Sequence, residues 1–231
     1  MMRALRYLLR MPWLLLHLLV LLPLAMFIVS LPWARRGEHG QRFDHRVIRW
    51  WSAGLVRVFG FRLRRVGEPL RGAVLFVAKR EIAGWPLVGW MAGRAETIFH
   101  QRGSAESMGG VLHEMLARLR RGRSVGVFPE GRTRDGREVG PFHARIFLAA
   151  VEAGVRVQPV ALRYGERGEA QTVVAFQPGE RFLGNFLRLL GEPARVAEVH
   201  FLVPVDTADA AGRRRIAGLA RERIVAAMQA P

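Results

Sequence analysis

Cysteine is absent from the 231 residues of this chain, and lysine occurs only once, at Lys79. Without a thiol, the chain forms no disulfide, presents no thiolate nucleophile and builds no cysteine-bound zinc site. Internal repeats, low-complexity stretches and long linkers are also missing. The length therefore suits one folded domain with an additional N-terminal segment.

Acidic residues are scarce: Asp and Glu number 19 against 36 Lys and Arg, which gives a net charge of +17. Such an excess does not set the fold, but it favours anionic partners such as nucleic acid, an anionic bilayer or a phosphate-bearing substrate. The basic residues are dispersed rather than interleaved with aromatic residues along one stripe, so we expect no nucleic-acid partner.

Polar side chains are nearly missing from residues 11–33, where only His17 and Ser30 interrupt the apolar sequence. A helix of this length would measure about 34 Å, enough to cross a hydrocarbon core. A secretory signal is a competing interpretation, but no small-x-small cleavage site follows the run. Arginines flank both ends, whereas a spanning helix normally has a one-sided bias, so a helix that dips into one leaflet fits as well as one that spans.

Residues 42–60 carry apolar side chains at helical spacing, including Trp50 and Trp51, with arginines between them. This pattern is typical of a helix at the membrane interface, and a core helix of the folded domain is the alternative. We therefore expect residues 1–60 to form a membrane-anchoring helical segment.

Beyond Gly60, short β-type runs alternate with amphipathic helices. The alternation predicts a three-layer α/β domain over residues 61–231 with a mostly parallel central sheet. The arginines at 213–215, 221 and 223 are expected on a solvated or membrane-facing side of the last helix. The predicted strands are Phe61–Val66, Ala73–Ala78, Glu96–His100, Ser124–Phe128, Val157–Leu162, Thr172–Phe176 and Val196–Val203, and the predicted helices are 105–121, 143–153 and 210–228.

The segment Phe128-Pro129-Glu130-Gly131 follows a predicted strand, at the end of which α/β sheets bind ligands. Gly131 permits close approach of the backbone to a ligand, and Arg132 and Arg134 offer planar donors suited to phosphate. Glu130 is placed to orient those cations or to accept a hydrogen bond from a glycerol hydroxyl. The alternative is an ordinary strand-to-loop turn with surface arginines.

Several segments, taken in order, resemble the glycerolipid acyltransferases, which acylate lysophosphatidic acid and its relatives. The resemblance covers roughly residues 61–165 and rests on Phe76–Pro86, Thr97–Phe99 before Arg102, Phe128–Arg134, Gly140–Arg145 and Val157–Val160. It implies that Phe128, Pro129, Glu130 and Gly131 hold a glycerol phosphate and that Arg102 binds phosphate. Lys79 would offer a point charge to phosphate or to an acidic carrier protein. The family places Pro159 near the site, although Val157–Val160 is primarily a core strand.

The function that the resemblance implies is a membrane-bound O-acyltransferase of phospholipid biosynthesis. Its donor is acyl-CoA or acyl carrier protein, its acceptor is a lysophospholipid such as lysophosphatidic acid, and its product is phosphatidic acid. No cofactor and no metal are implied. The expected location is the cytoplasmic face of a bacterial inner membrane.

The part of the family pattern that performs the chemistry is missing. These enzymes need a histidine followed five positions later by an aspartate, on a loop after an apolar strand. Here the apolar run Ala73–Ala78 passes directly into Lys79-Arg80-Glu81, as though a loop, its helix and one strand were deleted. The sequence therefore leaves the catalytic residues unknown and predicts impaired catalysis; a non-catalytic lipid- or phosphate-binding protein is the alternative.

Other histidines replace that pair poorly. His39 and Asp44 have the required spacing, but no strand precedes them and they lie between the two membrane segments. His100, His113, His143 and His200 have no aspartate at the required spacing. His143 is close to the Glu130 turn in sequence, where the simpler interpretation is a histidine at the start of a helix.

Overall fold

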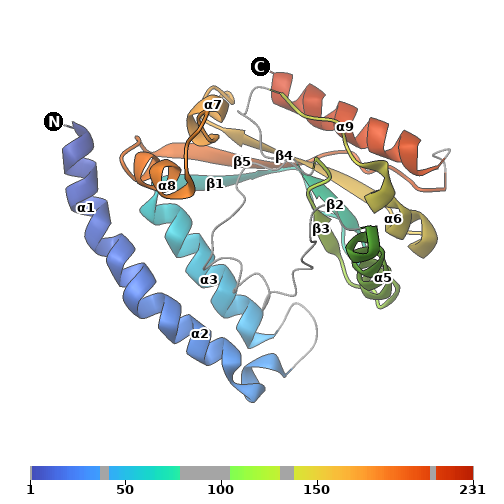
Figure 1. Ribbon diagram of the computed structural model, residues 1–231, viewed down its shortest axis with the longest axis horizontal. Coiled ribbons are helices and arrows are strands. Elements are labelled where there is room, and N and C mark those ends of the chain that lie inside the picture. The colour runs from blue at the N-terminus through green and yellow to red at the C-terminus, as the bar shows by residue number, and fades with distance from the viewer. Residues whose placement is uncertain (1, 37–41, 79–104, 131–137, 209–211, 231) are drawn as a thin grey trace. The chain divides into compact units, whose positions relative to one another are not determined.

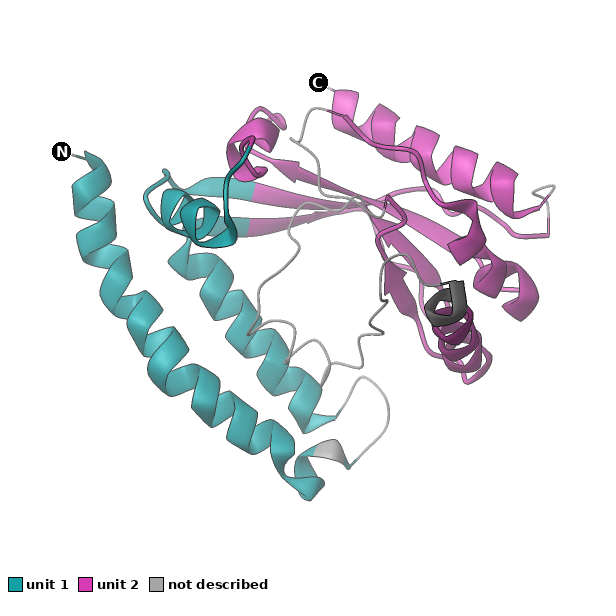
Figure 2. Cartoon of the chain, viewed as in Figure 1, with its two compact units in different colours: residues 1–62, 84–97, 179–196 teal, residues 63–83, 98–178, 197–231 magenta. Residues whose placement is uncertain are grey.

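The computed structural model describes residues 2–36, 42–78, 105–130, 138–208 and 212–230. The chain divides into two compact units (Figure 2). Unit 1 comprises residues 1–62, 84–97 and 179–196, and unit 2 comprises residues 63–83, 98–178 and 197–231. Most of the described part of unit 1 is helical, whereas unit 2 holds most of a five-stranded sheet and the helices that pack on it (Figure 1).

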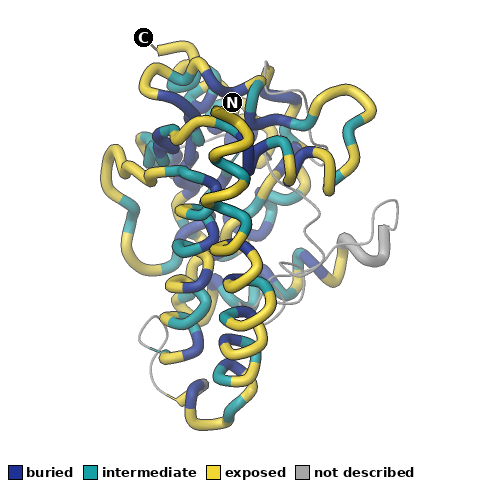
Figure 3. The backbone as a smooth tube through the Cα atoms, turned by 90° about the vertical axis from the view of Figure 1, so that its left-hand side faces the viewer, coloured by how far each residue is buried: buried dark blue, intermediate teal, exposed yellow. Residues whose placement is uncertain are grey.

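A long N-terminal helix forms the predicted apolar segment of unit 1. Helix α1 (Met2–Leu16) continues through a π-helical turn, η1 (His17–Leu21), into α2 (Leu22–Ser30), and a short 3-10 turn, η2 (Pro32–Arg35), follows. The most apolar 18-residue window of Met2–Ser30 has a mean hydropathy of 2.4, and the helix is long and apolar enough to cross a membrane. Only 28% of its most apolar window is buried, and exposed positions recur along it (Figure 3). Such a surface favours lipid over water as its neighbour.

The helix predicted over residues 42–60 is confirmed as α3 (Phe43–Val58). Trp51 and Leu55 are buried, whereas Trp50 is 59% exposed. One face of α3 therefore packs inside unit 1, and the other presents the exposed tryptophan expected of an interfacial helix. The core of unit 1 also includes a helix that we did not predict, α8 (Phe182–Leu190), and its buried members are Leu14, Leu22, Ala25, Trp51, Leu55, Phe59, Phe186, Leu189 and Leu190.

The π-helical turn is fastened to α3 by two polar contacts. His17 Nε2 lies 3.1 Å from the Trp51 carbonyl oxygen, and Trp51 Nε1 donates to the His17 carbonyl at 3.3 Å. A Cβ atom at Gly54 would come within 2.5 Å of the His17 ring, so only glycine allows this approach. The polar residue that interrupts the apolar run is thus satisfied within unit 1.

Two N-terminal arginines cap the carboxyl end of α8. Arg10 Nη1 donates to the carbonyls of Leu190 at 2.9 Å and Glu192 at 2.7 Å, and Arg6 Nη1 donates to the Gly191 carbonyl at 3.1 Å. Carbonyls at a helix end lack helical partners, and the helix dipole favours cations there. The sequence identified these arginines only as charges flanking a membrane segment; in the structure they also hold α1 to α8.

The sheet has the strand order β1-β5-β4-β2-β3. Strand β2 (Leu75–Ala78) pairs in parallel with both β3 (Val125–Val127) and β4 (Val157–Tyr164), and β4 pairs antiparallel with β5 (Arg195–Phe201). Strand β1 (Phe61–Val66) forms one edge, and the first two residues of β1 and β5 belong to unit 1. The predicted α/β class with a mostly parallel sheet is confirmed. The strand predicted at Glu96–His100 lies outside the described residues.

The prediction of a strand over Thr172–Phe176 is wrong. Residues Gln171–Val174 form one helical turn, α7. The chain reverses directly after β4, where Ala170 N donates to the Tyr164 carbonyl at 2.8 Å and Gln171 Nε2 donates to the Leu162 carbonyl at 2.9 Å. These tertiary contacts override the β propensity of the threonine and valines in this stretch.

The helices predicted in unit 2 are confirmed, with shifted ends. They are α5 (Ala105–Arg120), the 3-10 turn η3 (Ala144–Phe147) leading into α6 (Leu148–Ala153), and α9 (Arg213–Gln229). Helix α6 ends at Gly154, whose φ of 63° is a left-handed conformation that glycine adopts without strain. Apolar side chains from the strands and these helices form a large shared core, whose largest fully buried members are Phe147, Leu75, Met115, Leu119, Ile216 and Val77.

Candidate functional site

The carboxyl ends of β2 and β3 lie side by side in unit 2. Val77 is aligned with Val127 of β3 on one side and with Pro159 of β4 on the other. Ala78 and Phe128 each follow a member of this aligned pair, on strands that neighbour each other at about 4.8 Å. Ligands of α/β sheets bind at this kind of edge. The structure thus places the turn that starts at Phe128 beside the strand end where the missing histidine was expected.

The turn itself has one exposed and two buried side chains among its described residues. Phe128 is 53% exposed, Pro129 is buried, and Glu130 is only 5% exposed. A buried carboxylate needs hydrogen-bond donors, and the backbone N–H of Gly140 donates to Glu130 Oε2 at 3.0 Å. Glu130 is therefore a fixed group of the turn rather than a solvated surface charge.

A second hydrogen bond joins the turn to the block Gly140–Arg145. The backbone N–H of His143 donates to the Pro129 carbonyl at 3.0 Å. This contact places the His143 backbone against the turn, while the His143 side chain remains exposed. The segments Phe128–Arg134 and Gly140–Arg145, which the resemblance assigns to one site, are thus joined by a backbone hydrogen bond.

Helix α9 supplies an anchor that the sequence analysis missed. Arg221 Nε donates to the Gly140 carbonyl at 2.9 Å, and Arg221 Nη2 donates to the Val139 carbonyl at 2.7 Å. Arg223 Nη1 similarly donates to the Val203 carbonyl at 2.8 Å. Arg221 is exposed, as expected of a solvated or membrane-facing side, but both arginines also bond backbone carbonyls, which was not predicted. Arg221 fixes the residue whose N–H holds Glu130, and helical periodicity alone contains no signal for such a contact.

Several predicted site residues lie outside the described residues: Lys79, Arg102, Gly131, Arg132 and Arg134. Pro159, which the resemblance places near the site, is a buried member of β4. His39 is also outside the described part. Asp44, its partner by spacing, is 1% exposed in the first turn of α3, where Arg42 Nε donates to it at 3.2 Å. Asp44 is therefore occupied at the start of a unit 1 helix.

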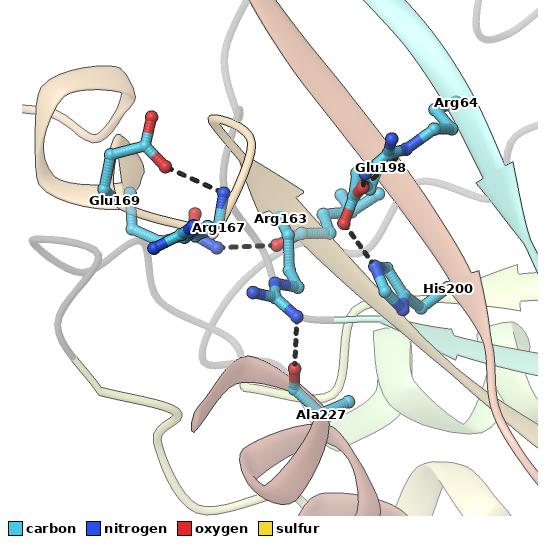
Figure 4. Close-up of polar contacts among 9 residues, drawn as sticks. Arg64, Arg163, Arg167, Glu169, Glu198, His200 and Ala227 are labelled. Atoms are coloured by element: carbon cyan, nitrogen blue, oxygen red, sulfur yellow. Dashed lines mark hydrogen bonds and ion pairs between the residues drawn. The ribbon is translucent and has the colours of Figure 1, made fainter. Parts of the chain in front are cut away.

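A buried carboxylate elsewhere in unit 2 has two basic partners (Figure 4). Glu198 of β5 is 3% exposed; it accepts a hydrogen bond from Arg64 Nε at 2.6 Å, and its Oε2 lies 2.7 Å from His200 Nε2. Burial raises the pKa of Glu198, but the hydrogen bonds from His200 and Arg64 outweigh it, and the net shift is downward. The expected catalytic pattern is an aspartate five positions after a histidine. Glu198 lies two positions before His200, so that pattern does not include it.

Comparison with known proteins agrees with this architecture. The sequence model of the family described as Acyltransferase matches residues 63–163. The lyso-ornithine lipid O-acyltransferase of Pseudomonas aeruginosa is 35% identical over 184 residues, which cover 70% of each chain. That of Brucella abortus is 32% identical over 232 residues, covering 85% of this chain and 83% of the relative. The chain belongs to the acyltransferase family.

Two further acyltransferases extend the comparison. The 1-acyl-sn-glycerol-3-phosphate acyltransferase of Neisseria gonorrhoeae is 32% identical over 138 residues, covering 60% of this chain and 54% of the relative. The crystal structure of the 1-acyl-sn-glycerophosphate acyltransferase PlsC from Thermotoga maritima superposes with a TM-score of 0.69 over the whole of both chains, at 17% identity. The latter similarity establishes the fold.

The two alignments with lyso-ornithine lipid O-acyltransferases are longer than the part of this chain that they cover. The Pseudomonas aeruginosa alignment runs over 184 positions, yet 70% of a 231-residue chain is fewer residues than that. The Brucella abortus alignment shows the same excess. Both relatives therefore contain residues within the aligned stretch that this chain lacks.

Proposed function

We propose that this chain is a membrane-associated lysolipid O-acyltransferase by descent, and that acyl transfer by the chain as it stands is impaired. The observation that carries the proposal is the end of β2. That strand lies between β3 and β4, ends at Ala78 and is followed directly by Lys79-Arg80-Glu81. The next histidine in the sequence after Ala78 is His100.

The chemistry explains why this gap matters. Acyl transfer requires a base that removes the proton of the acceptor hydroxyl as it attacks the thioester, and such help is commonly worth about 10² to 10⁴ in rate. Glu130 accepts the N–H of Gly140, which holds its carboxylate in place, and in this proposal it contacts the acceptor. Binding without a positioned base gives a site that holds its substrates and turns them over slowly.

The acceptor in this proposal is a lysolipid whose head group lies at the turn formed by residues 128–134. The relatives' names point to two acceptors, 1-acyl-sn-glycerol-3-phosphate and lyso-ornithine lipid. A phosphate would bind Arg102, Arg132 and Arg134, whereas the ammonium of an ornithine head group would bind Glu130. The two lipids are therefore to be compared directly.

The donor is acyl-CoA or acyl carrier protein, with no cofactor and no metal. The helix Met2–Ser30, whose surface is largely apolar, would lie in the lipid at the cytoplasmic face of a bacterial inner membrane. A site at that face receives a lipid acceptor from the bilayer and a soluble donor from the cytoplasm.

A second candidate function is non-catalytic binding of a lysolipid or phosphate. The missing histidine favours it, as does the intact bonding of Glu130, Gly140 and Arg221. The two candidates differ in one measurable property, which is turnover above the rate without protein.

Binding and turnover are to be measured on the same purified protein in detergent. Calorimetry with lysophosphatidic acid and with lyso-ornithine lipid should show binding of at least one of them. Conversion of that lipid with labelled acyl-CoA or acyl carrier protein should stay at or near background. Robust turnover would contradict the proposed impairment, and failure to bind either lipid or inorganic phosphate would contradict both candidate functions.

A further inference from the structure

A groove of about 320 Å³ lies between helix α9 and the segment that follows Gly140. One wall contains Phe142 and Ala144, and the other contains Ala217 and Gly218 of α9. Arg214 and Arg221 also line it. All of these residues belong to unit 2. The groove is therefore apolar along its walls and basic at two positions.

The two arginines differ in what they already bind. Arg221 uses Nε and Nη2 to hold the carbonyls of Val139 and Gly140. Arg214 is exposed and makes no hydrogen bond or ion pair within the part of the chain that the structure describes. Seven helical residues separate the two, which is about 10.5 Å along the axis. Arg214 thus offers a guanidinium at the end of the groove far from Gly140.

Residues at the other end of the groove are linked to the candidate site by hydrogen bonds, since Arg221 donates to the Gly140 carbonyl. Phe142 is two residues beyond Gly140, whose N–H holds Glu130, and it immediately precedes His143, whose N–H is bonded to Pro129. A ligand lying in the groove would therefore have one end near the Glu130 turn and the other near Arg214.

We propose that this groove holds the phosphopantetheine arm of the thioester donor, an assignment that rests on the proposed function. The arm is a flexible chain with a phosphate at one end and the thioester at the other. Its phosphate complements the charge of Arg214, its methylene and methyl groups contact the apolar walls, and its thioester end points toward the Glu130 turn. Coenzyme A and acyl carrier protein share this arm, so the groove would serve either donor.

Gly218 allows a sharp test of the assignment. A Cβ atom at Gly218 would meet no other atom within 4 Å, so a larger side chain there projects into open space and leaves the core undisturbed. Gly218→Leu would fill the groove, and Gly218→Ala is the matched control, since alanine also favours the helix. Arg214→Ala removes the proposed phosphate contact, and Arg215→Ala is its control, with the same change of charge on a neighbouring residue outside the groove.

The measurement is binding of coenzyme A and of 4′-phosphopantetheine by calorimetry to the full-length protein in detergent. We expect Gly218→Leu and Arg214→Ala to weaken the binding of both probes about tenfold or more, and the two controls to bind as the parent does. Equal affinity for both probes would assign recognition to the arm alone, whereas tighter binding of coenzyme A would add a nucleotide contact outside the groove.

Two outcomes would overturn the assignment. One is binding of both probes to Gly218→Leu with the parent's affinity; the other is absence of binding to the parent. Lysolipid binding is measured on the same variants and should not change. If the variants bind lysolipid and coenzyme A as the parent does, the groove assignment is rejected and the proposed function stands. If the parent binds neither lysolipid nor coenzyme A, the proposed function itself is rejected.

Discussion

Restoring a histidine after Ala78 is expected to restore acyl transfer. Val77 is aligned with Val127, so a residue inserted directly after Ala78 leaves the sheet beside Pro129 and Glu130. The variant carries a loop, helix and strand of the family type between Ala78 and Lys79, with a histidine near its start and an aspartate five positions later. Strand β2 then leads directly into the inserted histidine, as the strand before the catalytic histidine does in the family.

The expected gain follows from this geometry. Neighbouring strands are about 4.8 Å apart, so an imidazole just past Ala78 is close enough to reach a hydroxyl held at the Glu130 turn. A positioned general base contributes about 10² to 10⁴ in rate, which corresponds to roughly 2.7–5.4 kcal/mol of the activation barrier. We therefore expect the restored variant to exceed the parent by at least about 100-fold.

The assay is thioester-dependent acylation of lysophosphatidic acid and of lyso-ornithine lipid by purified protein. The matched control has the same insertion with alanine in place of the new histidine, and it should remain at the parent's rate. The reasoning fails if the parent already turns over as fast as the restored variant, or if the alanine control is equally active. A restored variant that binds lysolipid normally and yet stays inactive also refutes it. If the parent is active, His39→Ala tests whether His39 and Asp44 act as the catalytic pair.

Four further results are expected. Arg102→Ala should weaken lysophosphatidic acid binding at least about tenfold in calorimetry, because a charge-assisted contact contributes about 1.5–3 kcal/mol; unchanged binding would remove this arginine from the site. Glu198→Gln should lower the thermal stability at pH 7, because the hydrogen bonds from Arg64 and His200 hold the pKa of Glu198 below its ordinary value. That stabilisation exists above the unfolded pKa and is lost as the pH falls through the folded pKa, so parent and variant should converge in acid, and a gap that widens there would contradict the assignment. Arg10→Met should lower the melting temperature of the detergent-solubilised protein, because two hydrogen bonds to the end of α8 are lost, whereas Arg3→Met, which lacks those bonds, serves as control. The full-length protein should sediment with membranes after washing in high salt, and protein that stays soluble without detergent would contradict the proposed anchor.

The structure changes what truncation of the N-terminus is expected to show. Removing residues 1–60 deletes the helices that bury Phe186, Leu189 and Leu190 of α8, as well as Arg10, which caps that helix. The truncated chain would expose this apolar face, and we therefore expect it to aggregate rather than to be released as a folded soluble domain. Membrane attachment is better tested by replacing exposed apolar residues of the long helix, such as Leu8, Trp13 and Leu19, with polar ones.

Hydrophobic patterning predicted the regular part of the fold well. The runs that became β2, β3 and β4 are short, apolar and bounded by turn residues, and the helices α5 and α9 show the apolar periodicity of helices packed on a sheet. Helix α8 was missed because Gly184 and Asn185 weaken its intrinsic helix propensity, and contacts with α1 and α3 stabilise it instead. The strand wrongly predicted at Thr172 failed for the same reason, since tertiary contacts at the end of β4 decided the local conformation.

Only the part of the candidate site that consists of a local sequence motif was predictable. Phe128–Glu130 could be placed at the end of a strand from sequence alone, because a turn after an apolar run is a local feature. The bond between Gly140 and Glu130 joins two segments that the resemblance already names, but the arginine that holds Gly140 comes from a distant part of the chain. Arg221 donates to the Gly140 carbonyl through a contact that depends on how α9 packs in unit 2, and no spacing rule encodes it. The same holds for Glu198, whose partners lie on β1 and β5.

The missing segment and the continuous sheet together support one view of this chain. Strand β2 pairs with β3 on one side and β4 on the other, so one apolar run from Leu75 to Ala78 suffices to keep the described sheet unbroken. The bonds of Glu130 to Gly140 and of Gly140 to Arg221 do not involve β2, so they do not require a longer segment after Ala78. Under the proposed function, a chain without the family segment after Ala78 lacks the base and keeps these hydrogen bonds. Because these bonds do not depend on the segment after Ala78, we expect lysolipid binding to persist although turnover is lost. For the same reason, we expect an insertion after Ala78 to recover turnover.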